Sequence, residues 1–443
     1  MDQDNARLVR AGAHGFLFNA LTLGVNLATG VMVARELGSS GRGEFTAITT
    51  VLVIGVWIFS LGCTPAASFF IAREPHHAGR FMGTWLAIIV TVSVVATAVL
   101  ELALPTVLGA QASATQDLAR LYVLTLIVGL LYQLAYGALL GGHDFFFVYL
   151  VGFLRPLAIA VGFGLLIALH ALSVESAVAT TLSVDLVVCA ISLQRALKRY
   201  GLERPRSAVA KRTAWYGLRA QGTHLGGIIN GRLDVFILPA FLGASSVGLY
   251  SVATNVSWIV FTLASALSTF VLPVAAPRGR GGTSIVLVSL YATLAVGVLF
   301  AGVLGILGGV AVHLVYGPDF AGSVLSLRLL LPGTVAFSLA VVLLSGLDSL
   351  GRPGASAAAQ APGVLITVVG LLVFLDQGGI VAAAIVSSVA YTAVLVTALV
   401  LYRSAARLSW REFVLRPGEL LAHLRSLGAV ATRRIPAPRR QEL

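Results

Sequence analysis

The sequence predicts an all-α polytopic membrane protein with twelve transmembrane helices in two six-helix bundles. Two observations support this fold class: the chain is too apolar for a water-soluble core, and it contains an internal repeat. Of its 443 residues, 58% are hydrophobic and only 11% are charged. In soluble domains about a quarter of the residues are charged. Charge-free runs such as 11–34 and 377–402 exceed the ~18 residues typical of a membrane helix. These runs are continuous, unlike the short alternating strands of a membrane barrel.

The internal repeat spans about half of the chain. Leu37–Gly43 recurs as Leu242–Gly248 at an offset of 205, and Leu139–Asp144 recurs as Leu343–Asp348 at an offset of 204. Each half then holds six spans, an even number, so both halves enter the membrane in the same sense. The sequence therefore predicts a pseudo-two-fold axis along the membrane normal, as in parallel-repeat transporters.

Apolar runs between polar breaks define the individual spans. They are placed at 11–34, 45–72, 81–104, 118–141, 147–169, 176–197, 214–238, 248–273, 284–312, 322–347, 353–375 and 378–402. The corresponding organisation is an N-terminal six-helix bundle (1–197), a basic linker (198–213), a C-terminal six-helix bundle (214–402) and a basic, partly amphipathic tail (403–443). The apolar residues of the tail recur near helical spacing among arginines, which is typical of helices that lie on a membrane surface.

The basic residues predict the orientation. On the side that holds both termini and the 198–213 linker we count 23 of the 30 lysines and arginines. The positive-inside rule then puts both termini in the cytoplasm of a multi-pass cell (inner or plasma) membrane protein. The net charge of +12 is accounted for by this topology and by contact with anionic membrane lipids, so no nucleic-acid partner is expected. Cys63 and Cys189 both fall inside apolar spans, so neither a disulfide framework nor a metal cluster is expected.

Polar residues form matched stripes in the second and eighth spans. Each stripe follows helical spacing, so its members share one helix face. Shifted by 205 positions, the stripes coincide in four pairs: Thr46 with Ser251, Thr50 with Asn255, Ser60 with Ser265, and Thr64 with Thr269. Small polar residues of this kind commonly mediate helix packing, and they also line cavities. Both interpretations remain open.

The first and seventh spans supply further candidates for a cavity. Asn19 and Asn26 share a face in the first span, and Arg219, Asn230 and Asp234 share one in the seventh. A charge at mid-bilayer costs about 2.5–3.5 kcal/mol on insertion scales, so such residues normally face protein or water. The alternative for Arg219 is a side chain that snorkels to the inner interface. The alternative for Asp234 is a position at the outer boundary of its span.

Two further charged residues lie inside the N-terminal half. Asp185 falls within the 176–197 span, where it is a candidate for taking up a proton or for bridging helices. Arg155 precedes Pro156 in the 147–169 span and is a candidate cation for the cavity, with snorkelling as the alternative.

Several short motifs in order along the chain resemble a known family. They are VARELG (33–38), GRGEF (41–45), RLDVFIL (232–238), LG (242–243), VGLY (247–250), YGPDF (316–320), LLLPG (329–333) and GR (351–352). This pattern, which runs through about residues 7–402, resembles the polysaccharide-transport branch (the oligosaccharide flippases) of the multidrug/oligosaccharidyl-lipid/polysaccharide (MOP) exporter superfamily. The resemblance implies a MATE-like fold with a central cavity lined by the first, second, seventh and eighth helices.

The resemblance also implies a function. A flippase of this branch moves a polyprenyl-diphosphate-linked oligosaccharide from the inner to the outer leaflet by alternating access, for export of a cell-surface polysaccharide. Cations would offset desolvation of the diphosphate, and Arg219 and Arg155 are the candidates. The sugars would then meet Asn19, Asn26, Asn230, Asn255 and nearby hydroxyls, with Asp234 beside them, and Asp185 would be the ion-coupling residue. No bound cofactor is expected. Coupling to a proton or sodium gradient is expected, as is partnership with glycan-polymerising proteins.

Three other functions fit the sequence less well. A drug/cation antiporter of the same superfamily would use cavity acids, and Asp185 and Asp234 leave room for it. A polytopic glycosyltransferase or ligase would need gathered acids or histidines, but the sequence contains no paired carboxylates, metal-spaced histidines or phosphate loop. A non-transporting scaffold of a glycan assembly complex is the third alternative.

Overall fold

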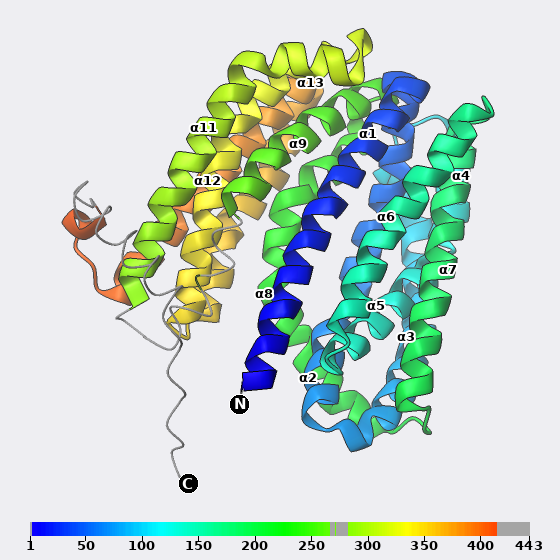
Figure 1. Cartoon of the computed structure of the whole chain (residues 1–443). Coiled ribbons are helices and arrows are strands. Elements are labelled where there is room, and N and C mark those ends of the chain that lie inside the picture. Colours follow the sequence, from blue (N-terminus) through cyan, green and yellow to red (C-terminus); the bar gives the residue numbers. More distant parts are fainter. Residues whose placement is uncertain (1, 266–270, 272–281, 414–443) are drawn as a thin grey trace. The chain divides into compact units, whose positions relative to one another are not determined.

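The computed structural model describes residues 2–265, 271 and 282–413, and every regular element within these ranges is helical (Figure 1). The α-helices are α1 (Asp2–Phe59), α2 (Cys63–Arg73), α3 (Ala78–Val107), α4 (Ser113–Val123), α5 (Leu126–Gly141), α6 (Phe145–Ala168), α7 (Val174–Tyr200), α8 (Ser207–Phe241), α9 (Ala244–Ser265), α11 (Thr283–Tyr316), α12 (Ser323–Ser349) and α13 (Pro353–Ala406). Three short 3₁₀ helices are η1 (Pro75–His77), η4 (Pro318–Phe320) and η5 (Trp410–Phe413).

The predicted spans fall on these helices, although the helices do not correspond to them one to one. α1 and α13 each carry two predicted spans, separated by kinks at Gly38 (φ 65°) and Gly379 (φ 52°). α4 and α5 together are apolar enough to cross a membrane and meet at a bend of 42°. By length and composition, 8 helices of the described residues, or 9 with the bent pair, are able to cross a membrane. The last residues of the predicted 248–273 span and most of the tail, 414–443, lie outside the described residues.

The contacts within the chain define two compact units. The first comprises 1–256, 304–330 and 364–387, and the second comprises 257–303, 331–363 and 388–443. These contact-based units divide the predicted 214–402 bundle between them. They are a different division of the chain from the predicted bundles, whose boundaries stay predictions. In the first unit α1 packs along α6 and α2 along α5 (Figure 1), around a core that includes Trp85 and Met82. In the second unit Phe337 stacks on Tyr391 with ring centroids 4.9 Å apart.

Two glycines bring the repeated segments into backbone contact inside the first unit. A Cβ on Gly43 would lie 1.7 Å from the carbonyl oxygen of Ala244, and a Cβ on Gly248 would lie 1.9 Å from that of Ser39. Because Ser39 and Ala244 are equivalent in the repeat, as are Gly43 and Gly248, the two contacts are copies of each other. We call this contact of four residues the glycine crossing. Such reciprocity is what a two-fold relation between the repeats requires.

Two arginines hold the chain beside the glycine crossing. Arg42 is only 6% exposed and donates to the carbonyl oxygen of Gly30 at 2.7 Å and to Oγ of Ser251 at 3.2 Å. Arg35 donates to the carbonyl oxygens of Leu314 and, at 2.8 Å, Val315. These carbonyls belong to the last turn of α11, where unpaired acceptors and the helix dipole favour a cation.

The predicted linker is docked on the first half of the chain. A Cβ on Gly83 would lie 1.8 Å from the carbonyl oxygen of Glu203, so the linker backbone rests directly on α3. Glu203 donates its N–H to Gly79 at 3.0 Å and accepts from Arg80 at 2.7 Å. Farther along, Arg212 pairs with Glu74 at 2.8 Å. The segment is therefore a strap on α3 and not a free tether.

We expect Gly43→Ala to destabilise the fold. The added methyl group would overlap the Ala244 carbonyl, so backbone must move, at a cost of about 1–3 kcal/mol. Thermal unfolding of the detergent-solubilised chain measures the loss. Gly24→Ala is the matched control, because no atom lies within 4 Å of its added Cβ. An unchanged unfolding temperature for Gly43→Ala would show that the glycine crossing is not tightly packed.

Protonation of Glu74 should loosen the docked linker. The hydrogen bond from Arg212 holds the pKa of Glu74 below its ordinary value. The pair therefore stabilises docking above the ordinary carboxyl pKa, and this contribution disappears as pH falls through the lowered pKa. At neutral pH, Glu74→Gln should speed amide hydrogen exchange of residues 201–213. Asp117→Asn, which breaks an exposed pair with Arg120, is the control. Equal exchange rates in both variants would contradict the view that the Glu74–Arg212 pair holds the linker in place.

Candidate functional site

A break in the second predicted span positions the candidate site. α1 ends at Phe59 and α2 begins at Cys63, and between them Leu61 (φ 49°) and Gly62 (φ 70°) adopt left-handed conformations. A side chain at Gly62 is excluded as well, because its Cβ would lie 1.9 Å from the carbonyl oxygen of Gly217 in α8. Non-helical backbone at membrane depth is tolerated where it is buried in protein or lines a cavity.

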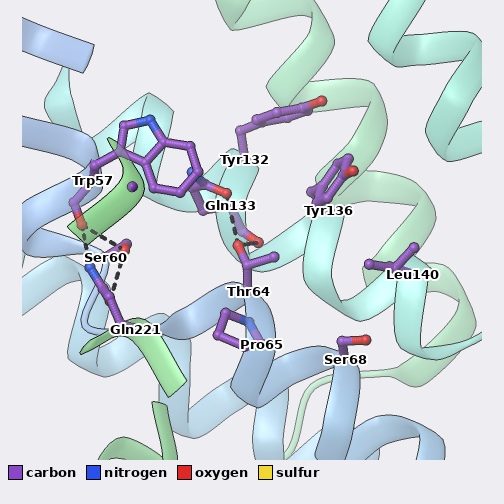
Figure 2. A pocket seen from close by; sticks show the side chains of 12 residues that line it. Trp57, Ser60, Thr64, Pro65, Ser68, Tyr132, Gln133, Tyr136, Leu140 and Gln221 are labelled. Atoms are coloured by element: carbon purple, nitrogen blue, oxygen red, sulfur yellow. Dashed lines mark hydrogen bonds between the residues drawn. The ribbon is translucent and has the colours of Figure 1, made fainter. Parts of the chain in front are cut away.

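A pocket of about 680 Å³ adjoins this break, and we call it the aromatic pocket (Figure 2). Its walls come from the end of α1, the break, α2, α5 and α8, all within the first compact unit. The lining residues are Trp57, Ser60, Gly62, Thr64, Pro65, Ser68, Tyr132, Gln133, Tyr136, Leu140, Gln221 and Gly227.

Hydrogen bonds between neighbouring helices fix the polar side chains of the aromatic pocket (Figure 2). Ser60 donates to the carbonyl oxygen of Trp57 at 3.0 Å and to Oε1 of Gln221 at 3.3 Å, and the Gln221 amide donates to the same carbonyl. Thr64 donates to Oε1 of Gln133 at 2.8 Å. These bonds tie α8 to the broken end of α1, and α2 to α5. The pocket is therefore preorganised.

The aromatic side chains leave their polar ends available. Tyr132 and Tyr136 lie one turn apart on α5, with ring centroids 6.0 Å apart. Figure 2 shows both rings projecting from the same helix beside Trp57 and Gln133. Within the described part of the chain, neither tyrosine hydroxyl makes a hydrogen bond. The aromatic pocket thus offers flat apolar rings beside neutral hydrogen-bonding groups, which suits a ligand with apolar faces and hydroxyl edges.

Arg155 and Asp185, which the sequence suggested for separate roles, are paired with each other. Nε of Arg155 donates to Oδ1 of Asp185 at 2.6 Å, and Nη2 donates to Oδ2 at 3.0 Å. This bidentate pair joins α6 to α7, with side chains 40% and 21% exposed. It also interacts electrostatically with Tyr132, a lining residue of the aromatic pocket.

Asp234 is a buried junction between three helices. It is 1% exposed, and its carboxylate accepts hydrogen bonds from Tyr250 at 2.5 Å, from Ser387 at 3.0 Å and from the N–H of Val235 at 2.8 Å. These donors come from α8, α9 and α13. In this conformation the carboxylate is enclosed and cannot touch a substrate.

Of the other predicted site residues, those whose side chains the structure describes do not line the aromatic pocket. Arg219 is exposed and lies over the Trp215 ring at 5.0 Å. Asn230 is 2% exposed and donates to the Gly226 carbonyl at 2.9 Å, Asn26 is exposed, and Asn255 is half-buried. The side chain of Asn19 lies outside the described residues.

Part of the pocket could be predicted from the sequence. Ser60 and Thr64 belong to the polar stripe of the predicted 45–72 span, and both line the pocket together with Trp57 of the same span. Tyr132 and Tyr136 were missed, although their spacing of four residues also places them on one helix face.

Comparisons with known proteins agree with this fold. The family described as "Polysaccharide biosynthesis protein" matches residues 143–325. No protein with a curated description matches the sequence. Among solved structures, the lipid II flippase MurJ in an inward closed conformation has a TM-score of 0.77 at 14% identity, covering 97% of this chain and 94% of its own. An inward-facing multidrug resistance MATE family transporter of the MOP superfamily has a TM-score of 0.70 at 16% identity, covering 87% and 94%.

A further MOP superfamily transporter, from Pyrococcus furiosus, has a TM-score of 0.56 at 14% identity, covering 91% of this chain and 96% of its own. These likenesses extend over nearly the whole chain and confirm the predicted all-α, MATE-like fold class. The family match over 143–325 agrees with the predicted resemblance in that part of the chain, and the chain is a multi-pass membrane protein with the fold of the MOP superfamily transporters.

Proposed function

We propose that the chain is a flippase that moves a polyprenyl-diphosphate-linked oligosaccharide from the inner to the outer leaflet of the cell membrane by alternating access. The observation that carries this proposal is the aromatic pocket, where Trp57, Tyr132 and Tyr136 stand beside neutral hydrogen-bonding side chains. Both termini and the linker would face the cytoplasm, as the distribution of basic residues predicts. The likeness to MurJ, a lipid II flippase, gives further support.

The aromatic pocket suits the glycan part of such a substrate. The C–H faces of a pyranose ring are apolar and weakly positive, so they pack against the negative faces of aromatic rings. The hydroxyl groups at the edge of the sugar would exchange hydrogen bonds with Tyr132, Gln133 and Ser68. A volume of about 680 Å³ accommodates a few sugar units at most, so the aromatic pocket would hold only part of a longer glycan.

The diphosphate would be met by Arg219 and Arg155. Arg219 is exposed, whereas Arg155 is already neutralised by Asp185. If the diphosphate displaces Asp185 from Arg155, the carboxylate loses its cationic partner. It would then bind a proton or a sodium ion in place of the arginine. Binding of the head group and binding of the coupling ion would then be linked through the same pair of residues.

Glycan-polymerising proteins remain the expected partners at the outer face, and membrane lipids surround the chain.

Tyr136→Ala should impair export. Loss of one stacking ring weakens sugar binding by about 1.4 kcal/mol, or roughly tenfold. The measurement is surface glycan in a deletion strain that carries the variant, together with the lipid-linked oligosaccharide retained on the inner leaflet. Phe374→Ala, which removes an aromatic ring that is 55% exposed, is the control. Normal surface glycan with increased drug sensitivity would instead favour a drug/cation antiporter.

Removal of the cations should slow flipping of the lipid-linked substrate in proteoliposomes. We expect Arg155→Ala and Arg219→Ala each to lower the rate by about tenfold, since each removes a charge-assisted contact with the diphosphate. Asp185→Asn should abolish the response of the rate to an imposed proton or sodium gradient. Wild-type rates in both arginine variants would refute the head-group assignment, and an unchanged gradient response in Asp185→Asn would refute the coupling assignment.

A further inference from the structure

Among the described residues, no charged side chain lines the aromatic pocket. Its lining in the described part of the chain consists of aromatic, hydroxyl, amide, glycine, proline and leucine residues. We infer that it selects an uncharged glycan, built from neutral sugars such as hexoses, deoxyhexoses or N-acetylhexosamines, and discriminates against uronic acids and other anionic sugars. This inference rests on the proposed flippase function and specifies its substrate class.

The broken helix end does not supply an anion site in place of side chains. A helix N-terminus binds anions through its free N–H groups. Here the N–H of Cys63 donates to the Ser60 carbonyl at 2.8 Å, and the N–H of Ala66 donates to the Gly62 carbonyl at 3.0 Å. Pro65, between them, has no N–H. Three of the first four positions of α2 therefore have no free donor.

Two charged side chains interact electrostatically with Tyr132 of the aromatic pocket, and they neutralise each other. The pair that interacts with Tyr132 consists of one arginine and one aspartate, held together by two hydrogen bonds. Arg219, the other proposed cation, lies over Trp215 and does not line the pocket. A carboxylate that enters the pocket would give up water and would meet Arg155 only by displacing Asp185, and both costs would oppose its binding.

The polar groups that remain unused match hydroxyls. The Tyr132 and Tyr136 hydroxyls make no hydrogen bond within the described residues, and the same holds for the Ser68 hydroxyl. A hydroxyl both donates and accepts, as sugar hydroxyls do, whereas a carboxylate only accepts. Gln133 is held at Oε1 by Thr64, which orients its amide nitrogen as a neutral donor. The aromatic pocket is thus complementary to a neutral polyol in shape, polarity and charge.

The test compares two substrates on one carrier. Full-length protein in proteoliposomes is supplied with a polyprenyl-diphosphate-linked trisaccharide of neutral hexoses and with the same molecule in which the terminal hexose is a uronic acid. The rate at which each glycan reaches the opposite leaflet is measured. We expect the neutral substrate to be flipped at least about tenfold faster. If the uronic-acid substrate is flipped equally fast or faster, the inference is overturned while the flippase function stands. If neither is flipped, the proposed function itself fails, and the inference fails with it.

A charge introduced into the aromatic pocket provides the matched variant. Gln133→Lys should raise the rate for the uronic-acid substrate relative to the neutral one, because the lysine supplies the missing cation. Gln194→Lys adds the same charge at an exposed position of α7 and should leave the ratio unchanged. An equal change of the ratio in both variants would show that overall charge, and not the pocket, determines selectivity, and would overturn the inference.

Discussion

The chain must satisfy its backbone hydrogen bonds in an apolar environment, and the rest of the structure depends on this constraint. Helices meet it locally, which is why the described residues form helices throughout. Where a helix is interrupted, the freed groups need partners. At Leu61 and Gly62 the interruption lies against α8 and beside the aromatic pocket. The break and the candidate site are therefore one feature of the chain.

The charges inside the helical region obey a related constraint. Arg155 is paired with Asp185, Asp234 accepts three hydrogen bonds, and Arg42 donates to a carbonyl and a hydroxyl. Each group is held by partners from other helical segments, so each also fixes helix positions. Neutral residues are left to form the surface of the aromatic pocket. A binding surface that is neutral over its described residues can accept a large polar ligand and release it again, which transport requires.

Sequence reasoning predicted the helices and missed most of the site. Hydropathy and the duplicated motifs suffice for the spans, because membrane helices are determined by local composition. The pairing of Arg155 with Asp185 joins residues 30 positions apart on different helices, and no pattern within either helix indicates it. Tyr132 and Gln133 could not be predicted from charges and asparagines, because the aromatic pocket is lined by rings, hydroxyls and glutamines. Burial of Asp234 by Tyr250 and Ser387 likewise depends on tertiary packing.

The glycine crossing also bears on how the chain arose. Its two contacts, Gly43 with Ala244 and Gly248 with Ser39, are what a single six-helix protein would make across the axis of a homodimer. In that ancestor one glycine would have served both contacts, so the packing could arise by a single substitution. Fusion of two copies of such an ancestor would turn the symmetric interface into an internal one and would release each copy to vary. Arg42, whose counterpart is Val247, records that divergence beside a contact that both copies still share.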